Sequence, residues 1–474
     1  MNKLKLFLEN FLVYGLGGII SKAVPLLMVP VVTRLMPSSE YFGLCDLSNV
    51  ITNFAVYFSI MGMYDAMYRL FFDKDDTQFK QSVCSTAFIF TLITSLIVFS
   101  IMLIFKDIVA VYFFNNTQYT YLVYICAISV LVGATNAIVS APTRMQNNRK
   151  VFLVTNTLSP IIAYSISIPM LLKGYYVTAL PIAGVISGFI LELSFWYMNK
   201  QWFRVKFFDF KLLKQLLTLA IPLAPSFFVY WIFSSCDKIM ITNILGIKEA
   251  GIYAVGAKLG TASQLIYLAF AGGWQYFAFS TMNEKEQVKN NSLVFEYLGA
   301  ISFISTAFVC AISNTFFKFI FSFEYLSGFI VAPYLFMSPL LLMLYQIIGN
   351  QFLVVKKAWP SLIILSVGAL TNFLLNLWLI PLFGIEGAAV ATLTGYIVTV
   401  IIGLIVLYKM KLVVVSKAFS IMTLFVIIYF TCWRLIFASN VIYGLIFTFL
   451  LMTVCSIIYK NVLYMLYFLL RQKL

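Results

Sequence analysis

The stretch LTNFLLNLWLIPLFGIEGAAVATLTGY, residues 370–396, decides the fold of this chain. Two apolar runs are separated by Pro381, which ends a helix, and by Gly384, which permits a tight turn. Gly387 and the two alanines after it let the second helix approach its neighbour closely, as small residues do inside membranes. The stretch therefore predicts a pair of transmembrane helices joined by a sharp turn.

The composition of the whole chain extends this prediction. Of its 474 residues, 62% are hydrophobic and only 10% are charged, whereas a soluble protein carries roughly 25% charged residues. A large soluble enzyme is therefore excluded. Apolar stretches long enough to span a bilayer predict an all-α integral membrane protein with about fourteen transmembrane helices. Their centres are expected near residues 22, 55, 94, 130, 162, 187, 225, 264, 306, 342, 370, 397, 426 and 451.

The lysines and arginines predict the orientation of these spans. With the N-terminus in the cytoplasm, 22 of the 32 basic residues fall in inner segments and 7 in outer loops, the rest lying within or at the edge of spans. Inner loops of membrane proteins are enriched in this way, so both termini are expected in the cytoplasm. The net charge of +15 then faces anionic membrane lipid, and a nucleic-acid partner is not expected.

Two features of the composition limit the chemistry. The chain has no histidine, which removes Ser-His triads and most zinc sites. Its seven cysteines are scattered singly, so they are interpreted as small apolar side chains rather than as a redox or disulfide framework. No metal site, cofactor or catalytic residue is expected.

Weak sequence matches at one shared offset indicate an internal repeat. TRLMPSSE (33–40) aligns with TNILGIKE (242–249) at an offset of 209, and Gly174 aligns with Gly384 at 210. Six helices per repeat would give two lobes of the same orientation, as in transporters with parallel repeats. We expect an N-lobe over residues 1–208, a C-lobe over 209–410 and a C-terminal helix pair over 411–474.

Three segments carry a resemblance to a known family. Residues 370–396 resemble the segment that joins the last two core helices of polysaccharide-biosynthesis flippases, which belong to the multidrug/oligosaccharidyl-lipid/polysaccharide exporter superfamily. SKAVPLLMVPVVTRLMPSSEYFGLCDL (21–47) and CDKIMITNILGIKEAGIYAVGAKL (236–259) look like the openings of the two lobes. The Pro-x-x-Gly-Ile-x-Gly-Ala-Ala pattern is shared with lipid II flippases and drug exporters.

The resemblance implies a function, a location and partners. In that family a polyprenyl-diphosphate-linked oligosaccharide passes through a central cavity by alternating access, for the assembly of cell-surface polysaccharide such as O-antigen. It implies the bacterial plasma (inner) membrane as the location. The expected partners are the polyprenyl-diphosphate-linked glycan, membrane lipid and other polysaccharide-assembly proteins.

Charged residues inside the predicted spans are the candidate site. Lys22 lies near the middle of span 1, where a lysine costs on the order of 3 kcal/mol on insertion scales. We expect it to line a wet cavity, although a buried pair with Asp46 or Asp65 is the alternative. Lys258 would lie opposite in the second lobe. The expected lining of this central cavity consists of Lys22, Lys258, Asp46, Asp65, Asn49, Asn53, Gln264 and Trp274, and its polar members could equally join helices.

Two further groups lie nearer the ends of the spans. Arg34, Asp237 and Lys238 could shape the outer mouth, with simple solvation at the interface as the alternative. Arg69, Arg144 and Arg149 could form an inner gate or capture a diphosphate, whereas topology alone also explains them. Asp65 and Arg69 stand four residues apart, so an ordinary helix-face pair between them is a competing interpretation.

Other functions fit the sequence less well. A cation-coupled multidrug exporter of the same superfamily would favour a buried acid in span 1, where this chain has Lys22. A membrane glycosyltransferase or polymerase usually needs a large external loop, and none is present. An ATP-driven pump is not expected either, because the segment GAKLGT (256–261) has the wrong spacing for a phosphate-binding loop and lies in a predicted helix. The chain is therefore expected to be a transporter and not an enzyme.

Overall fold

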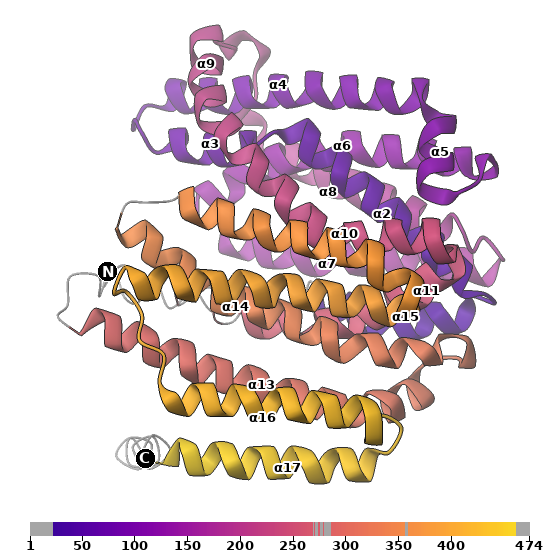
Figure 1. Ribbon diagram of the computed structural model, residues 1–474. Helices are drawn as coiled ribbons and strands as arrows, with labels where there is room; N and C mark the ends of the chain where they lie inside the picture. The colour runs from indigo at the N-terminus through magenta and orange to yellow at the C-terminus, as the bar shows by residue number, and fades with distance from the viewer. Residues whose placement is uncertain are drawn as a thin grey trace. The chain divides into compact units, whose positions relative to one another are not determined.

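The computed structural model describes residues 22–268, 270, 274, 278, 286–355 and 359–460, apart from the side chain of residue 149. Within these ranges the chain is almost entirely helical and contains no strand (Figure 1). The all-α class predicted from composition is therefore confirmed.

The helices of the first part of the chain follow residues 22–35, which are themselves helical. Serine, asparagine or aspartate side chains cap several of them; Asp76, for example, accepts hydrogen bonds from the backbone amides of Gln78 and Phe79, the usual way to satisfy a helix N-terminus. The helices are α2 (Ser39–Ile60), α3 (Met63–Phe71), α4 (Thr77–Ile104), α5 (Lys106–Phe114), α6 (Thr120–Met145), α7 (Arg149–Leu172) and α8 (Ala179–Asn199).

The later helices begin after the loop that follows α8. They are α9 (Phe210–Ala220), α10 (Ala224–Leu245), α11 (Ile247–Gly260), α13 (Gln287–Ile320), α14 (Val331–Val354), α15 (Trp359–Lys409), α16 (Lys417–Cys432) and α17 (Val441–Ile458). Helix α9 runs across the direction of α4 (Figure 1). It buries Leu212, Leu216 and Ala220, which recur on one face, and exposes Lys211 and Lys214. This pattern is typical of a helix at a membrane interface.

The number of spans is close to the expected fourteen. In the described ranges, ten helices are long and apolar enough to cross a membrane, or eleven when the bent pair α2 and α3 counts as one span. Helix α15 covers 51 residues and contains two helices that meet at Gly384. Expected spans 1 and 8 run into residues outside the described ranges. The chain is thus a multi-pass membrane protein.

The turn in α15 has the geometry that its sequence predicts. Gly384 has φ +61° and ψ −141°, a conformation that glycine adopts readily and other residues rarely do. A Cβ atom on Gly387 would lie 2.1 Å from the carbonyl oxygen of Leu379, so only glycine allows the two helices to meet there. Ala388 and Ala389 are fully buried. The close packing inferred from the sequence is confirmed.

The helices repeat at the offset found in the sequence. The start of α13 follows the start of α4 by 210 residues, and the start of α15 follows that of α7 by the same number. Gly174 and Gly384 both have positive φ. Similar hydrogen bonds also occur: the amide of Arg204 donates to Ser85 Oγ, and the amide of Val414, 210 residues later, donates to Ser292 Oγ, which follows Ser85 by 207 residues. These matches support the internal repeat predicted from the sequence.

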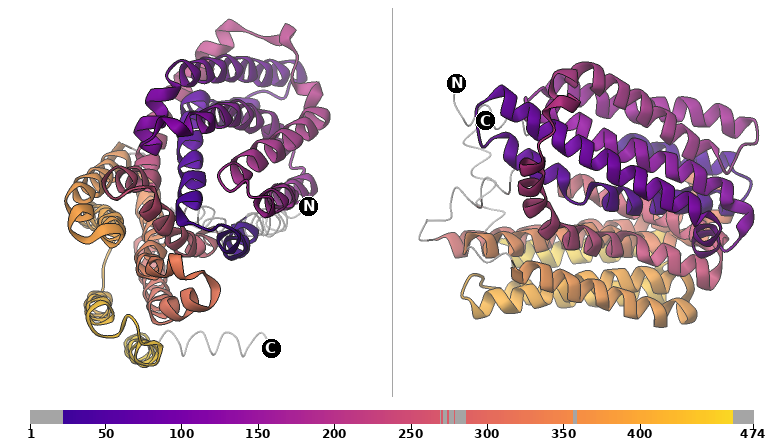
Figure 2. Two further views of the ribbon diagram at one scale, coloured as in Figure 1. Left: turned by 90° about the vertical axis from the view of Figure 1, so that its right-hand side faces the viewer. Right: turned by 90° about the horizontal axis from the view of Figure 1, so that it is seen from above.

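The helices form two compact units. Unit 1 contains residues 1–254 and 376–388, and unit 2 contains residues 255–375 and 389–474. In unit 2, α13 packs against α14, α16 and α17; Figure 2 shows these helices from two further sides. Unit 1 holds α2 to α8 together with α9, α10 and the start of α11. The first helices of the second repeat thus pack with the first repeat, and this packing creates the site described next.

Candidate functional site

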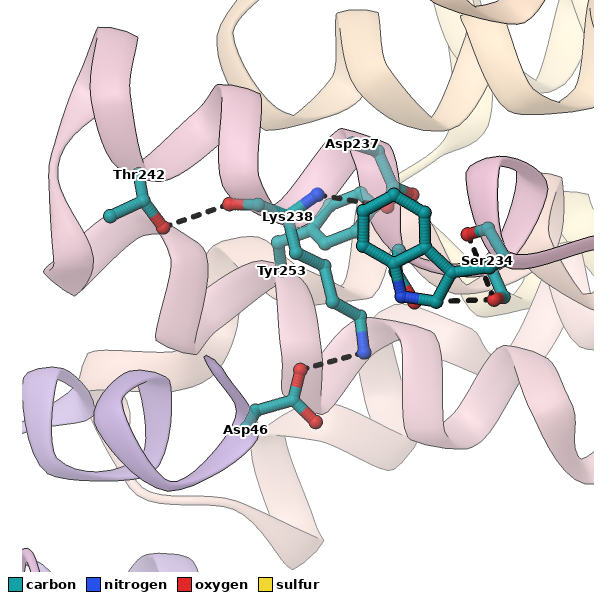
Figure 3. A network of polar contacts seen from close by, with 8 residues as sticks. Asp46, Ser234, Asp237, Lys238, Thr242 and Tyr253 are labelled. Atoms are coloured by element: carbon teal, nitrogen blue, oxygen red, sulfur yellow. Dashed lines mark hydrogen bonds and ion pairs between the residues drawn. The ribbon is translucent and has the colours of Figure 1, made fainter. Parts of the chain in front are cut away.

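An ion pair between α2 and α10 lies at the centre of the site. The ammonium nitrogen Nζ of Lys238 is 2.6 Å from Oδ2 of Asp46, and the side chains are only 17% and 6% exposed. Asp46 stands seven residues after the start of α2, and Lys238 seven residues before the end of α10. At 1.5 Å per residue, the pair is about 10 Å from the helix ends that we predict to be outer. Figure 3 shows the two side chains pointing toward each other.

A second buried acid stands beside this pair. Asp237 is 4% exposed and accepts a hydrogen bond from the hydroxyl of Tyr253 on α11, which is fully buried. The amide of Lys238 also donates to Asp237 Oδ1, over 2.8 Å. One turn further along α10, the hydroxyl of Thr242 donates to the carbonyl oxygen of Lys238 (Figure 3). The network therefore joins α2, α10 and α11 through polar atoms.

These residues are placed differently from one sequence interpretation. Simple solvation at the interface was the alternative expectation for Asp237 and Lys238, but both side chains, like that of Asp46, are largely buried. The reason is geometric: each lies on the face of its helix that meets a neighbouring helix. Burying charges is costly unless they are paired and hydrogen-bonded, and the network supplies both. The alternative expectation of a buried pair between Lys22 and Asp46 is wrong, since Lys22 is exposed and Asp46 pairs with Lys238.

Near the predicted outer ends, α2 and α11 meet backbone to backbone. Ser39 Oγ donates a hydrogen bond of 3.1 Å to the carbonyl oxygen of Lys248. A Cβ atom on Gly251 would lie 1.9 Å from the carbonyl oxygen of Ser39, and one on Gly43 would lie 2.5 Å from that of Ile247. Both positions therefore require glycine. These are the two glycines that follow the aligned repeat motifs.

Toward the opposite ends, aromatic rings continue the contact between α2 and α10. The ring centroids of Phe54 and Trp231 are 4.3 Å apart, and those of Tyr57 and Phe227 are 6.0 Å apart in a nearly parallel arrangement. Such pairs add to the free energy gained from apolar burial. We call the whole contact, made by Asp46, Phe54, Tyr57, Phe227, Trp231 and Lys238, the α2–α10 seam.

The other residues expected in a central cavity are dispersed between the two units. Lys22, Asn49, Asn53 and Asp65 have exposed side chains in unit 1. Because Lys22 is exposed, it does not form the buried acid pair that was its alternative. The remaining three belong to unit 2, where Lys258 and Gln264 are half-buried and Trp274 is buried. Arg34 is exposed.

At the predicted inner ends, the arginines have local partners. Arg69 pairs with Asp73, not with Asp65 as one interpretation expected, because Asp73 is also one helical turn away. The guanidinium of Arg144 lies 4.5 Å from the ring centroid of Phe152, and its Nη1 is 3.4 Å from the hydroxyl of Tyr64. The side chain of Arg149 lies outside the described part of the structure.

Two buried polar residues were missed at the sequence level. Tyr253 binds Asp237, but a lone tyrosine in an apolar run gives no signal for such a contact. Glu192 on α8 is 8% exposed and lies next to Thr135 and Trp196. Its signal was available, because Glu192 is the only charged residue between Lys173 and Lys200. An acid within a membrane span is a candidate functional residue.

Comparison with known proteins identifies the family. Residues 31–330, well over half of the chain, match the family model described as "Polysaccharide biosynthesis protein". The chain belongs to this family. Among curated protein sequences, none matches it significantly. The polysaccharide-biosynthesis family predicted from three sequence segments is thus confirmed.

Solved structures support the fold of this family member. The lipid II flippase MurJ in an inward closed conformation is 16% identical, with a TM-score of 0.70 over 94% of this chain and 98% of that one. An inward-facing multidrug resistance MATE transporter of the MOP superfamily is 13% identical, with a TM-score of 0.62 over 83% and 98%. A MOP superfamily transporter from Pyrococcus furiosus gives 15% and 0.57, over 85% and 96%. The chain therefore has the all-helical fold of MOP transporters.

Proposed function

We propose that this protein moves a polyprenyl-diphosphate-linked oligosaccharide from the inner to the outer leaflet of the bacterial plasma membrane. Membership of the polysaccharide-biosynthesis family supports a glycan substrate. The similarity to a structure titled as a lipid II flippase supports a lipid-linked one. The polysaccharide that receives the glycan, such as O-antigen, and a cytoplasmic position of both termini belong to the same proposal.

The observation that carries the mechanism is the buried pair between Asp46 and Lys238. It joins a helix of the first repeat to a helix of the second, near the ends predicted to be outer. In the proposed cycle, the N-lobe (1–208) and C-lobe (209–410) rock against each other, and the Asp46–Lys238 part of the α2–α10 seam closes the outer side. Opening that side separates the two charges. This is tolerable only when water or substrate replaces the lost partner, because an unpaired buried charge costs about 3–5 kcal/mol.

In this proposal, lysine and arginine side chains bind the anionic groups of the substrate. Lys22 and Lys258 attract the diphosphate inside the passage, and Arg34 extends the positive surface toward the outer mouth. Arg69, Arg144 and Arg149 collect the headgroup at the inner surface. Charge-assisted hydrogen bonds to phosphate are among the strongest that side chains make. The helix pair over 411–474 is an addition to the two lobes.

The experiment is a flipping assay with the purified full-length protein. Proteoliposomes receive a short-chain polyprenyl-diphosphate glycan with a fluorescent label on the sugar, and a membrane-impermeant quencher reports the leaflet that holds the label. We expect the protein to accelerate exchange over protein-free vesicles. A fluorescent cationic dye in the same vesicles tests the drug-exporter alternative. Dye transport without glycan movement would overturn the proposal.

A further inference from the structure

A polar cavity lies inside unit 1, apart from the α2–α10 seam. Its volume is about 210 Å³. It is half open to the surroundings and is lined by residues of α6, α7 and α8, which contact one another. Polar side chains at helical spacing line it from two sides. They are Asn136, Ser140 and Thr143 on α6, and Thr155, Asn156 and Ser159 on α7.

The presence of polar stripes within membrane helices has to be explained. Apolar residues of the same size would pack these helices together without desolvating polar groups. Polar groups inside membrane bundles commonly mark a substrate pathway or join helices by hydrogen bonds. Asn136 Oδ1 is buried and has no hydrogen-bond partner among the described residues. Joining helices therefore does not account for the whole lining.

The lining side chains keep oxygen lone pairs for a ligand. Thr155 Oγ1 donates to the carbonyl oxygen of Val151 over 2.9 Å, and Ser140 Oγ donates to that of Ala137 over 3.2 Å. Asn156 Nδ2 donates to the carbonyl oxygen of Phe152 over 2.8 Å. With these protons used inside the helices, the remaining capacity is mostly that of acceptors. A complementary ligand carries several hydrogen-bond donors, as hydroxyl groups do.

One cation completes the lining. Arg144 is exposed, and its guanidinium is held against the face of Phe152 and near the hydroxyl of Tyr64. Among the residues that the structure describes, none that lines the cavity is acidic. Arg144 can therefore bind an anionic group while the two stripes bind hydroxyls. Phe195 on α8 supplies an apolar wall, which suits the face of a saturated ring.

We propose that this cavity binds a single sugar unit that carries one anionic group, a carboxylate or a phosphate. Pockets for drug-sized ligands measure roughly 300–1,000 Å³, so a cavity of about 210 Å³ suits one ring and not an oligosaccharide. The assignment rests on the proposed function in one respect: the sugar belongs to the transported glycan. Arg144 then selects glycans by the charge of one unit rather than by the diphosphate alone.

The test measures binding directly, without transport. Full-length protein in lipid nanodiscs is mixed with D-glucuronate, glucose 1-phosphate, D-glucose or inorganic pyrophosphate, and saturation-transfer NMR reports contact with each. We expect transfer to both charged sugars and at least tenfold weaker binding of glucose, because hydrogen bonds between charged groups are worth more than neutral ones. Stronger transfer to glucuronate than to glucose 1-phosphate would identify a carboxylate as the preferred group, and the reverse a phosphate. Binding of pyrophosphate alone would overturn the sugar assignment.

Variants locate the binding in the cavity. Arg144→Gln should remove the preference for charged sugars, and Asn156→Leu should weaken glucose and glucuronate alike by filling the space. Arg204→Gln is the matched control, since Arg204 is an exposed arginine that does not line the cavity, and it should leave binding unchanged. Equal transfer to glucuronate in the wild type and in both cavity variants would refute the proposal.

The two proposals fail in different ways. Sugar binding that responds to Arg144, in a protein that does not flip lipid-linked glycans, would refute the flippase and leave the cavity a sugar site. Flipping that is unaffected by Asn156→Leu, together with sugar binding by this variant equal to that of the wild type, would refute the cavity and leave the flippase intact.

Discussion

Ser39 donates a hydrogen bond to the carbonyl oxygen of Lys248, the residue that stands 209 positions later in the chain. This separation equals the offset between the two aligned repeat motifs. The two residues therefore occupy equivalent places in the two repeats and touch each other. Such a self-contact is expected where a pseudo-twofold axis passes between repeats. Because the two backbones touch there, the meeting point of α2 and α11 leaves the least room for amino-acid substitutions.

The glycines at this meeting point should tolerate no side chain. Gly251→Ala would place a methyl group 1.9 Å from the carbonyl oxygen of Ser39, so the helices must separate. Overpacking of this kind typically costs about 1–3 kcal/mol. We expect a lower thermal unfolding temperature and reduced glycan flipping. Gly184→Ala is the control, because its added methyl group would have no neighbour within 4 Å; equal effects at both positions would contradict the prediction.

The ion pair of the seam should behave as a coupled unit. Asp46→Asn or Lys238→Met alone leaves one buried charge without its partner, and we expect a loss of about 3–5 kcal/mol in stability. The double variant should recover much of this loss, because it leaves neither charge. Thermal unfolding of the four proteins of this double-mutant cycle gives the coupling free energy. Additive single effects would show that the two side chains do not depend on each other.

Lys22→Ala should stop transport without unfolding the protein. The side chain is exposed, so its removal leaves no cavity, and we expect unchanged insertion and unfolding temperature. Flipping of the lipid-linked glycan should fall to the protein-free rate. Lys173→Ala, which removes an exposed lysine between α7 and α8, is the matched control. Wild-type flipping by the Lys22 variant would show that this amine is merely tolerated.

The turn in α15 provides a test of orientation. A cysteine at Gly384 itself would be strained by the positive φ, so the neighbouring Phe383, which is 62% exposed, is the better position. In a background without native cysteines, Phe383→Cys should react with an impermeant thiol reagent added to whole cells, and Arg204→Cys should not. The reverse pattern would invert the predicted topology.

The sequence predicts those features that depend on local pattern. The apolar spans, the turn at Gly384 and the offset between repeats follow from residue type and spacing alone. The buried pair of Asp46 and Lys238 could not be predicted in this way. Hydropathy predicts the depth of a residue along the membrane normal. It does not show whether the face of the helix that carries the residue packs against a neighbouring helix, and this packing determines whether a charged side chain is solvated or paired.

The cavity beside Arg144 illustrates an intermediate case. Asn136, Ser140 and Thr143 repeat at intervals of four and three residues, and Thr155 and Ser159 on the next helix are four residues apart. The spacing alone identifies a polar stripe on each helix. Only the packing of α6 against α7 and α8 brings the two stripes to one cavity. Glu192 was identifiable from charge alone, whereas its burial against α6 required the structure.

The α2–α10 seam has a consequence for how the polypeptide can be divided. A cut in the segment 199–209 would separate the two repeats and leave α9 and α10 at the start of the second fragment. That fragment would carry Trp231 and Lys238, the counterparts of Phe54 and Asp46 on the first. Two separately synthesised fragments would thus each carry one side of this contact. When both insert into the same bilayer, the aromatic and charged residues would allow the fragments to associate.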